Sequence, residues 1–201
     1  MLHEKAITML TKRMRKSQHQ DHSIVNVEEG EFIFNCSGLV NYLLRESLPA
    51  FIEFWSHTGE SPQVLDYCSR IESLDEKPSP HWLRIHKVTD MAPGDLLVWK
   101  RPRFEGEYGK YPDGHAMVIA DFPSPSWREG EMLVTVVDST KQPHLEDTRE
   151  KDKLTGLGLG TVGLGVNPDG TPKSYWWRGG ISEKEITTWV GAARLIERET
   201  S

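Results

Sequence analysis

A change in residue pattern near Met91 constrains the fold of this chain more than any other feature of its sequence. Before it, apolar residues recur at helical spacing, as in the C-S-G-L-V-N-Y-L-L segment at 36–44. After it, the segments 115–121 and 132–138 are typical of short strands, and residues that favour turns separate them. Helices first and antiparallel strands later predict an α+β fold.

The length of 201 residues predicts a single domain over residues 1–201. A short amphipathic helix is expected at about 5–15, with a polar segment at 17–26 ending it. Residues 50–90 mix aromatic residues with prolines, so we expect an insertion with irregular or short helical structure. A closing strand is expected at 187–196.

The composition excludes several classes of protein. The net charge of -6 argues against a nucleic-acid partner and against an electrostatic membrane anchor. No transmembrane segment is expected, because no apolar run reaches the roughly 18 residues that a spanning helix needs. The first residues lack the apolar region of a signal peptide. The chain is therefore expected to be cytoplasmic as written, or secreted or in the cell envelope if a leader has been removed.

Cys36 is expected at the first turn of a core-facing helix that ends before Pro49. Unpaired backbone N–H groups and the positive end of the helix dipole stabilise an anion there, which favours the thiolate. The small residues Ser37 and Gly38 let a substrate approach the sulfur and leave the Cys36 N–H free to bind an oxyanion. Cys36 is thus a candidate nucleophile, whereas Cys68 is expected to be an ordinary thiol.

His115 is the candidate base, and pairing of the two central strands selects its partner. If 115–121 and 132–138 pair antiparallel with Ala120 opposite Leu133, His115 faces Asp138. The residues between them on the same face are apolar and are expected to receive the helix that begins at Cys36: Met117, Ile119, Val134 and Val136. A thiol, an imidazole that takes its proton and a carboxylate that orients the imidazole form a nucleophile set.

Three blocks of the sequence carry a family resemblance. F-N-C-S-G-L-V-N-Y-L-L resembles the nucleophile motif of NlpC-type cysteine peptidases, M-A-P-G-D-L-L-V-W their Pro-Gly-Asp-Leu turn and strand, and G-H-A-M-V-I-A their histidine strand. The resemblance implies a papain-like (NlpC-type) fold, related to that of CHAP amidases, in which the nucleophile helix packs on an antiparallel sheet or partial barrel. It also implies that Cys36 is the nucleophile, His115 the base and Asp138 the third polar residue.

The predicted function is that of a cysteine hydrolase, which cleaves an amide or isopeptide bond through an acyl-enzyme. The resemblance implies a peptide or peptidoglycan stem peptide as substrate. Residues flanking the catalytic pair are expected to bind it: Asn35, which stands where the family usually has Asp, Ser37 and Gly114. No cofactor and no metal are expected.

Several alternatives stay open at this point. The chain could instead be a catalytically inactive binding module of the same fold, or a thiol acyltransferase. His144 could replace Asp138 as the orienting residue if its strand runs longer. Asp113, His115, Asp138 and His144 are metal-ligand types, but they lack the tight spacing of a metal motif. The G-L-G-T-V-G run at 158–163 matches a dinucleotide-binding pattern, but a turn follows it where that pattern needs a helix.

Overall fold

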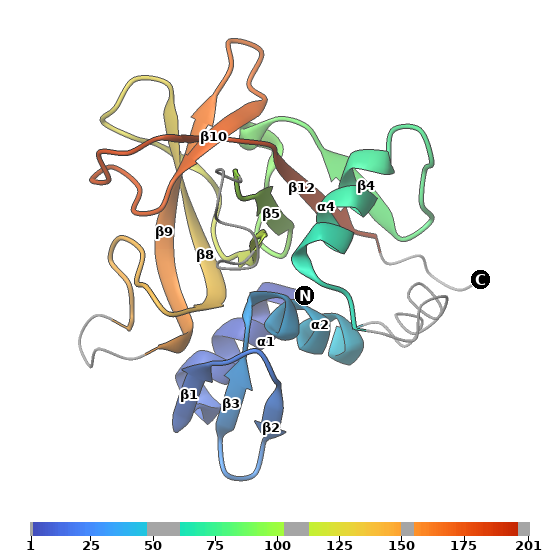
Figure 1. Ribbon diagram of the computed structural model, residues 1–201, viewed down its shortest axis with the longest axis vertical. Helices are drawn as coiled ribbons and strands as arrows, with labels where there is room; N and C mark the ends of the chain where they lie inside the picture. Colours follow the sequence, from blue (N-terminus) through green and yellow to red (C-terminus); the bar gives the residue numbers. More distant parts are fainter. Residues whose placement is uncertain (1, 48–60, 103–112, 150–154, 197–201) are drawn as a thin grey trace.

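The computed structural model describes residues 2–47, 61–102, 113–149 and 155–196. Most of the regular secondary structure in this part of the chain is β-structure (Figure 1). The helices are short: α1 (Leu2–Thr8), which continues into the π-helical turn η1 (Met9–Arg13), α2 (Cys36–Ser47), α4 (Val64–Ser73) and the 3-10 turn η2 (Val88–Asp90). The small sheet has three strands: β1 (Lys16–His19), β2 (Ile24–Asn26) and β3 (Glu31–Phe34).

The large sheet has nine strands, which pair antiparallel throughout. They are β4 (Trp82–Ile85), β5 (Leu96–Lys100), β6 (Gly114–Ile119), β7 (Ser124–Pro125), β8 (Glu131–Thr140), β9 (Gly156–Val166), β10 (Pro172–Trp176), β11 (Ile186–Thr187) and β12 (Val190–Leu195). Their order is β11-β10-β9-β8-β6-β5-β12-β4, and β7 pairs with β8. The sheet curls, since β10 also contacts β12.

The predicted papain-like α+β fold is wrong. A nine-stranded antiparallel sheet dominates the regular structure of the described chain, and α1, α2 and α4 have only 7, 12 and 10 residues. One cause is the segment at 17–26, expected as a polar connection, which contributes β1 and β2. The residues of β1, K-S-Q-H, include no apolar side chain, so no alternating pattern signals this strand.

The region expected as an insertion also contributes to the large sheet. Residues 50–60 lie outside the described part of the chain. The remainder includes α4 and β4, and β4 pairs with β12, with Ile85 opposite Ala192. Within the described residues, no helix is long and apolar enough to cross a membrane.

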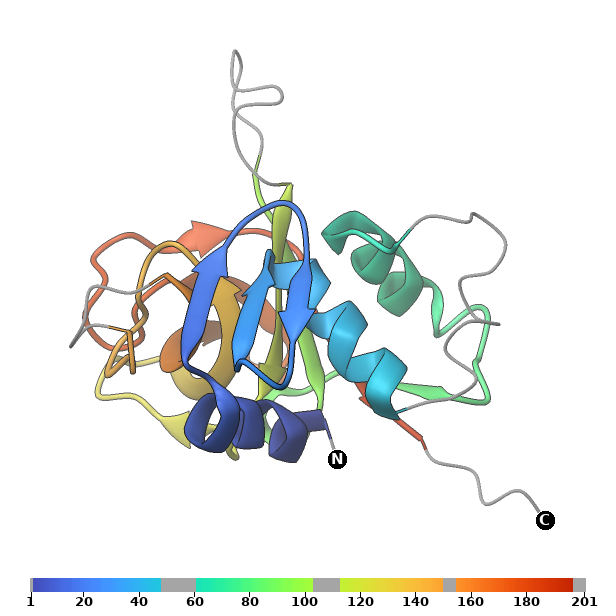
Figure 2. The same ribbon diagram turned by 90° about the horizontal axis from the view of Figure 1, so that it is seen from below.

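Helix α2 begins where Asn35 caps it. The Asn35 side-chain oxygen accepts a hydrogen bond from the Gly38 N–H at 2.7 Å, which satisfies one of the N–H groups left free in the first turn. The helix lies between the small sheet and α4 (Figure 2). A hydrogen bond from the Tyr67 hydroxyl to the side chain of Asn41, at 2.5 Å, joins α2 to α4.

The face of the large sheet that receives α2 is the opposite of the one predicted. The apolar residues of α2 share a core with Ala116, Val118 and Val137. The residues expected to receive the helix instead belong to a second core inside the curled sheet: Met117, Ile119, Val134 and Val136, together with Trp99 and Tyr175. The expectation failed because curling lets the sheet bury one of its faces against itself.

The M-A-P-G-D turn before β5 is fixed by a buried carboxylate. Asp95 is 1% exposed and accepts a hydrogen bond from the Ala92 N–H at 2.8 Å. Arg194 of β12 donates to both carboxylate oxygens, at 2.8 and 2.9 Å, and to the Asp90 carbonyl at 2.9 Å. The turn is therefore tied to a strand about a hundred residues away along the chain.

We expect Asp95→Ala to lower the free energy of unfolding by about 1–3 kcal/mol, because it removes several hydrogen bonds, two of them from a charged donor. Urea denaturation measures the change. Asp75→Ala is the matched control, since Asp75 is exposed and pairs with Arg84 at the surface, where such pairs contribute about 0–1 kcal/mol. Equal losses in the two variants would contradict the anchoring role of Asp95.

Candidate active site

Cys36 is the first residue of α2, and its side chain is buried against β6. The thiol interacts through hydrogen bonds with the His115 side chain and with the backbone of Ala116. Its position at the helix start, which the sequence predicted, also exposes the sulfur to the positive end of the helix dipole. The structure thus brings the predicted nucleophile and the predicted base together.

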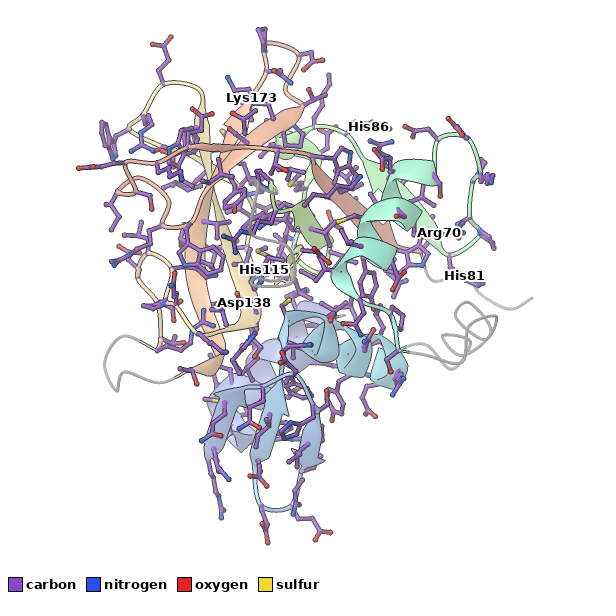
Figure 3. All side chains as sticks on the ribbon, in the orientation of Figure 1. Arg70, His81, His86, His115, Asp138 and Lys173 are labelled. Atoms are coloured by element: carbon purple, nitrogen blue, oxygen red, sulfur yellow. The ribbon has the colours of Figure 1, made fainter. Side chains whose placement is uncertain are left out.

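His115 lies on β6 and contacts Asp138 of β8 directly. Its Nε2 lies 2.5 Å from Asp138 Oδ2, and Figure 3 shows the two residues beside each other between the large sheet and α2. Since Nε2 is engaged with the carboxylate, Nδ1 is the ring nitrogen left for the thiol. A continuous path of hydrogen bonds therefore runs from Cys36 through His115 to Asp138.

The register that joins β6 to β8 differs from the predicted one by two residues. The structure pairs Val118 with Val137 and Ile119 with Val136. His115 therefore lies diagonally from Asp138 and not directly opposite it. A shift of two residues keeps each side chain on its original face of the sheet, and diagonal neighbours are still within reach of long side chains.

The charges of Cys36 and His115 depend on each other. Burial raises the pKa of the Cys36 thiol, but the positive charge of His115 and hydrogen bonds from His115 and Ala116 outweigh it, so the net pKa is lowered. Burial lowers the pKa of His115, yet the Cys36 charge and the hydrogen bond to Asp138 raise it to about 10. Both directions favour a thiolate and imidazolium pair at neutral pH.

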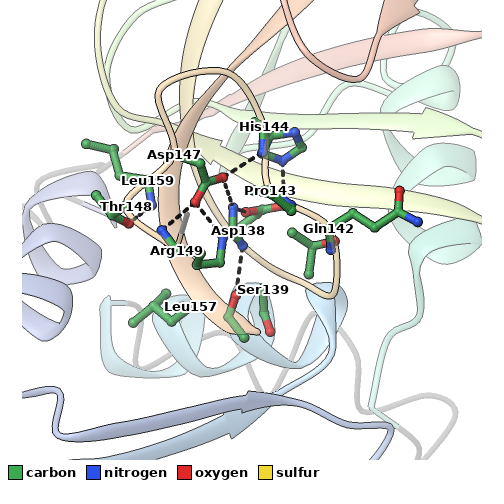
Figure 4. A network of polar contacts seen from close by, with 12 residues as sticks. Asp138, Ser139, Gln142, Pro143, His144, Asp147, Thr148, Arg149, Leu157 and Leu159 are labelled. Carbon is green, nitrogen blue, oxygen red and sulfur yellow. Dashed lines mark hydrogen bonds and ion pairs between the residues drawn. The ribbon is translucent and has the colours of Figure 1, made fainter. Parts of the chain in front are cut away.

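Asp138 is fully buried and receives three donors, as Figure 4 shows in part. His115 and His144 approach Oδ2 at 2.5 and 3.0 Å, and the Arg149 Nη2 group donates to Oδ1 at 2.8 Å. Burial raises the pKa of this carboxyl, but the charges of His144 and Arg149 and the histidine hydrogen bonds hold it well below its usual range. The carboxylate is thus ionised despite having no contact with water.

His144 and Arg149 have further hydrogen-bond partners on the side away from Asp138. The Nδ1 atom of His144 lies 2.8 Å from the Trp177 carbonyl, so the two ring nitrogens face two acceptors, this carbonyl and Asp138. Arg149 donates to both oxygens of Asp147, at 2.7 and 2.6 Å, and to the Gly156 carbonyl at 2.8 Å. Of the two predicted alternatives for the orienting residue, Asp138 contacts His115 directly, and His144 contacts Asp138.

The Gly-rich run in β9 makes room for Arg149. Gly158 lies directly opposite Asp138 across the strand pair, on the same face. A Cβ atom at Gly158 would lie 2.3 Å from Arg149 Nε, and one at Gly160 would lie 2.6 Å from Asp147 Oδ2. The sequence analysis missed Arg149, although glycines at alternate positions of a strand are a signal of close approach by other groups.

Aromatic rings close the site on the β10 side. The Trp177 ring lies 5.2 Å from the ring of His115 and 4.4 Å from that of His144, centroid to centroid. Trp99 lies 5.8 Å from His115. His19 of β1 is half-buried nearby, and its Nδ1 lies 3.0 Å from the Ser139 carbonyl. Sequence patterns gave no sign that His19 would border the site.

The predicted substrate-binding residues have different surroundings. Asn35 and Ser37 line a pocket of about 330 Å³ along α2, which also includes Asp21, Tyr42, Arg45 and Gln63. Cys36 itself does not line this pocket, although its two neighbours in the chain do. Gly114 lies elsewhere, in tight packing: a Cβ there would lie 2.1 Å from the Trp99 carbonyl oxygen.

Cys68 differs from Cys36 in its electrostatic surroundings. It lies within α4 and is fully buried, and, unlike Cys36, it has no hydrogen bond to a histidine among the described residues. Burial raises the pKa of its thiol to about 12. Cys68 is therefore an unreactive thiol that provides an internal reference for Cys36.

Three side chains could in principle hold a metal ion. His115, Asp138 and His144 each offer one ligand atom, and these atoms lie within 4.8 Å of one another. Each imidazole Nε2 is at hydrogen-bond distance from the same carboxylate oxygen, however, and ligands that share a zinc ion at about 2.0–2.2 Å stand further apart than 2.5 Å when arranged tetrahedrally. The geometry favours protons over a metal between these groups.

Comparison with known proteins finds a viral relative of this chain but no matching family model. No protein-family model matches the chain. The uncharacterized protein R653 of Acanthamoeba polyphaga mimivirus is 30% identical over 164 residues, which cover 72% of this chain and 68% of that protein.

The buried carboxylate predicts a specific dependence of stability on acid. The pKa of Asp138 lies well below its unfolded value of about 3.9, so the unfolded chain binds this proton first as the pH falls. The stabilisation is present above about pH 4 and is lost as the pH falls through the folded value. Asp138→Asn should therefore flatten the decrease in unfolding free energy between pH 5 and 3.

Urea denaturation at several pH values measures the acid dependence of Asp138→Asn and its loss of stability at pH 7. At pH 7 the variant should lose about 3–5 kcal/mol, because two cationic groups lose a buried counter-charge. Asp169→Asn is the control, since Asp169 also has a lowered pKa but lies in an exposed turn. An acid dependence in Asp138→Asn as steep as in the unmodified protein would show that Asp138 is not the group responsible.

Proposed function

We propose that this chain, which belongs to the same family as the mimivirus protein R653, is a cysteine hydrolase that cleaves an amide or isopeptide bond. Cys36 would be its nucleophile, His115 its general base and acid, and Asp138 the residue that orients the imidazole. The observation that carries this proposal is the path of hydrogen bonds from the thiol through His115 to a buried, ionised carboxylate.

The first half of the reaction follows from the charges of the pair. The Cys36 thiolate attacks the carbonyl carbon, a C–S bond forms, and the carbonyl oxygen takes the negative charge. Asn35 caps the Gly38 N–H, but the N–H groups of Cys36 and Ser37 have no partner within the helix, so they suit the developing oxyanion. The His115 imidazolium then gives its proton to the leaving nitrogen, the C–N bond breaks, and a thioester remains.

The second half regenerates the thiol. His115, now neutral, accepts a proton from water, and the resulting hydroxide attacks the thioester carbonyl. The C–S bond breaks, the carboxylic acid product leaves, and the sulfur recovers its negative charge opposite the imidazolium. Throughout, Asp138 holds the Nε2–H side of His115, so that Nδ1 stays directed at the sulfur.

The pocket beside α2 supports a peptide as the substrate class. It adjoins the nucleophile through Asn35 and Ser37, and most of its lining side chains are polar, with one acidic and one basic residue, Asp21 and Arg45. Such a lining offers hydrogen-bond donors and acceptors to backbone amides. Peptidoglycan stem peptides, which the sequence motifs suggested, are the first peptides to test.

The proposal predicts that Cys36 is alkylated as a thiolate below the usual pH range for cysteine. Its rate with iodoacetamide should reach a plateau well below pH 8, because the pKa of the thiol is lowered by His115. His115→Ala should restore an ordinary dependence with a midpoint near 8.5 or above. Peptide mass spectrometry gives the rate at each cysteine, and the buried Cys68 serves as the internal control.

Two outcomes of the alkylation experiment would contradict the proposal. The first is a Cys36 that titrates like an ordinary thiol in the unmodified protein. The second is a low midpoint that survives in His115→Ala, since the thiolate would then owe its stability to another group. His86→Ala, which changes an exposed histidine that pairs with Asp75, is the matched control and should leave the profile unchanged.

Turnover of peptide amides provides the direct test of activity. A library of fluorogenic peptides and peptidoglycan fragments should include a substrate whose hydrolysis Cys36→Ala and His115→Ala each reduce by about 10³-fold or more. Cys68→Ala should keep the activity. Hydrolysis that persists in Cys36→Ala would rule out the thiol as nucleophile.

A further inference from the structure

The cluster behind Asp138 contains more charged groups than a nucleophile, a base and an orienting residue require. Its further members are fully or almost fully buried: His144, Asp147 and Arg149 are 0%, 5% and 2% exposed. Polar groups of this kind are costly to bury, and an apolar residue in their place would pack without that cost. Their presence against Asp138 therefore needs an explanation beyond the packing of the fold.

We propose, on the basis of the function proposed above, that Arg149 is a positioning residue for the reaction. It acts through Asp138, which it holds ionised and correctly aligned beneath His115, and His144 supports it from the other oxygen. Arg149 does not touch the thiol or, in any contact of the described chain, the place where the substrate reacts. Its effect on the chemistry is transmitted by the carboxylate alone.

The geometry around Asp138 supports this division of roles. Oδ2 faces His115 and His144, so Oδ1 is left for Arg149, which donates to it at 2.8 Å. With a donor on each oxygen the carboxylate cannot rotate about its Cβ–Cγ bond without breaking a charge-assisted hydrogen bond. The orientation of Oδ2 toward His115 is thereby fixed by a contact on the opposite side of the group.

Arg149 is in turn held in a single orientation by contacts that leave no freedom to its guanidinium group. Asp147 binds it through both carboxylate oxygens, and the Gly156 carbonyl accepts its Nη1–H at 2.8 Å. Gly158 lies beneath it without a side chain. A planar fork with several fixed donors suits this arrangement, whereas a lysine offers one ammonium group.

The charges of the neighbouring groups explain why a basic residue lies behind Asp138. Asp138 alone would balance the imidazolium of His115 and leave the thiolate uncompensated in a buried site. The cluster holds three acidic groups, Cys36, Asp138 and Asp147, and the guanidinium of Arg149 adds a second positive charge to that of His115. Removing the charge of Arg149 makes the cluster more negative, which disfavours the thiolate.

The test uses alkylation of Cys36, because it needs no substrate. In Arg149→Met the rate at pH 6 should fall roughly tenfold, which corresponds to a midpoint shifted upward by about one pH unit. Arg149→Lys keeps the charge and should recover part of the rate. Gly158→Ala leaves Arg149 in the sequence but displaces its side chain, since the added Cβ lies 2.3 Å from Nε, and it should shift the midpoint in the same direction.

Arg194→Met is the matched control for a merely structural role. Arg194 also binds a buried carboxylate through two hydrogen bonds and a backbone carbonyl through a third, but it lies on β12, away from Cys36. The Arg194→Met substitution should lower the stability of the protein and leave the pH profile of Cys36 alkylation unchanged. Once a substrate is found, Arg149→Met should lower kcat with little change in KM.

The outcomes separate this inference from the proposed function. A folded Arg149→Met with the same Cys36 midpoint as the unmodified protein overturns the positioning role and leaves the hydrolase proposal intact. An ordinary Cys36 profile in the unmodified protein overturns the hydrolase itself. If Arg149→Met fails to fold, judged by circular dichroism and by loss of Cys68 protection, Arg149→Lys and Gly158→Ala decide the question in the same assay.

A metal ion in the cluster would give a different result. If zinc, bound by His115, Asp138 and His144, were responsible for the low midpoint of Cys36 alkylation, a chelator would change the Cys36 profile of the unmodified protein. We expect no change on treatment with EDTA. A chelator-dependent midpoint would overturn the proposal, because the metal and not Arg149 would then hold the carboxylate.

Discussion

The Asp138 carboxylate is the constraint on which the rest of the site depends. A carboxylate removed from water costs several kcal/mol unless charged donors replace its hydration. Here three donors on two separate segments do so: His115 on β6, and His144 and Arg149 in the connection that follows β8. The connection could not take another path without leaving the carboxylate unsatisfied, so one buried charge fixes both a loop and the central strand pair.

The thiol reaches this carboxylate from the other side of the sheet. Helix α2 packs on the face formed by Ala116 and Val118, while His115 and Asp138 project from the opposite face. They meet at the end of β6, where the first residue of the helix comes beside the strand and a histidine side chain can reach around its edge. A site built at the end of strands in this way leaves both faces of the sheet free for packing.

The sequence predicts which residues come together at the site better than it predicts the fold. Cys36 at a helix start and His115 with Asp138 on one strand face depend on local patterns, and even a register wrong by two residues preserves the face. The papain-like fold was wrong because its prediction extended three short motifs to the whole chain. β1 has no apolar residue, and the pairing of β4 with β12 joins segments over a hundred residues apart.

Arg149 and the glycines opposite it show why the charged residues behind Asp138 were not predicted from the sequence. Nothing in the local sequence of Arg149 distinguishes it from a surface arginine, because its burial results from the cross-strand position of Gly158. The glycines, in turn, match a nucleotide-binding pattern as well as they match a space for a side chain. Neither Arg149 nor Gly158 alone indicates a buried arginine, because the burial depends on the contact between them. Because the charge of Cys36 depends on contacts such as that of Arg149 with Asp138, substitutions away from the nucleophile can change its reactivity.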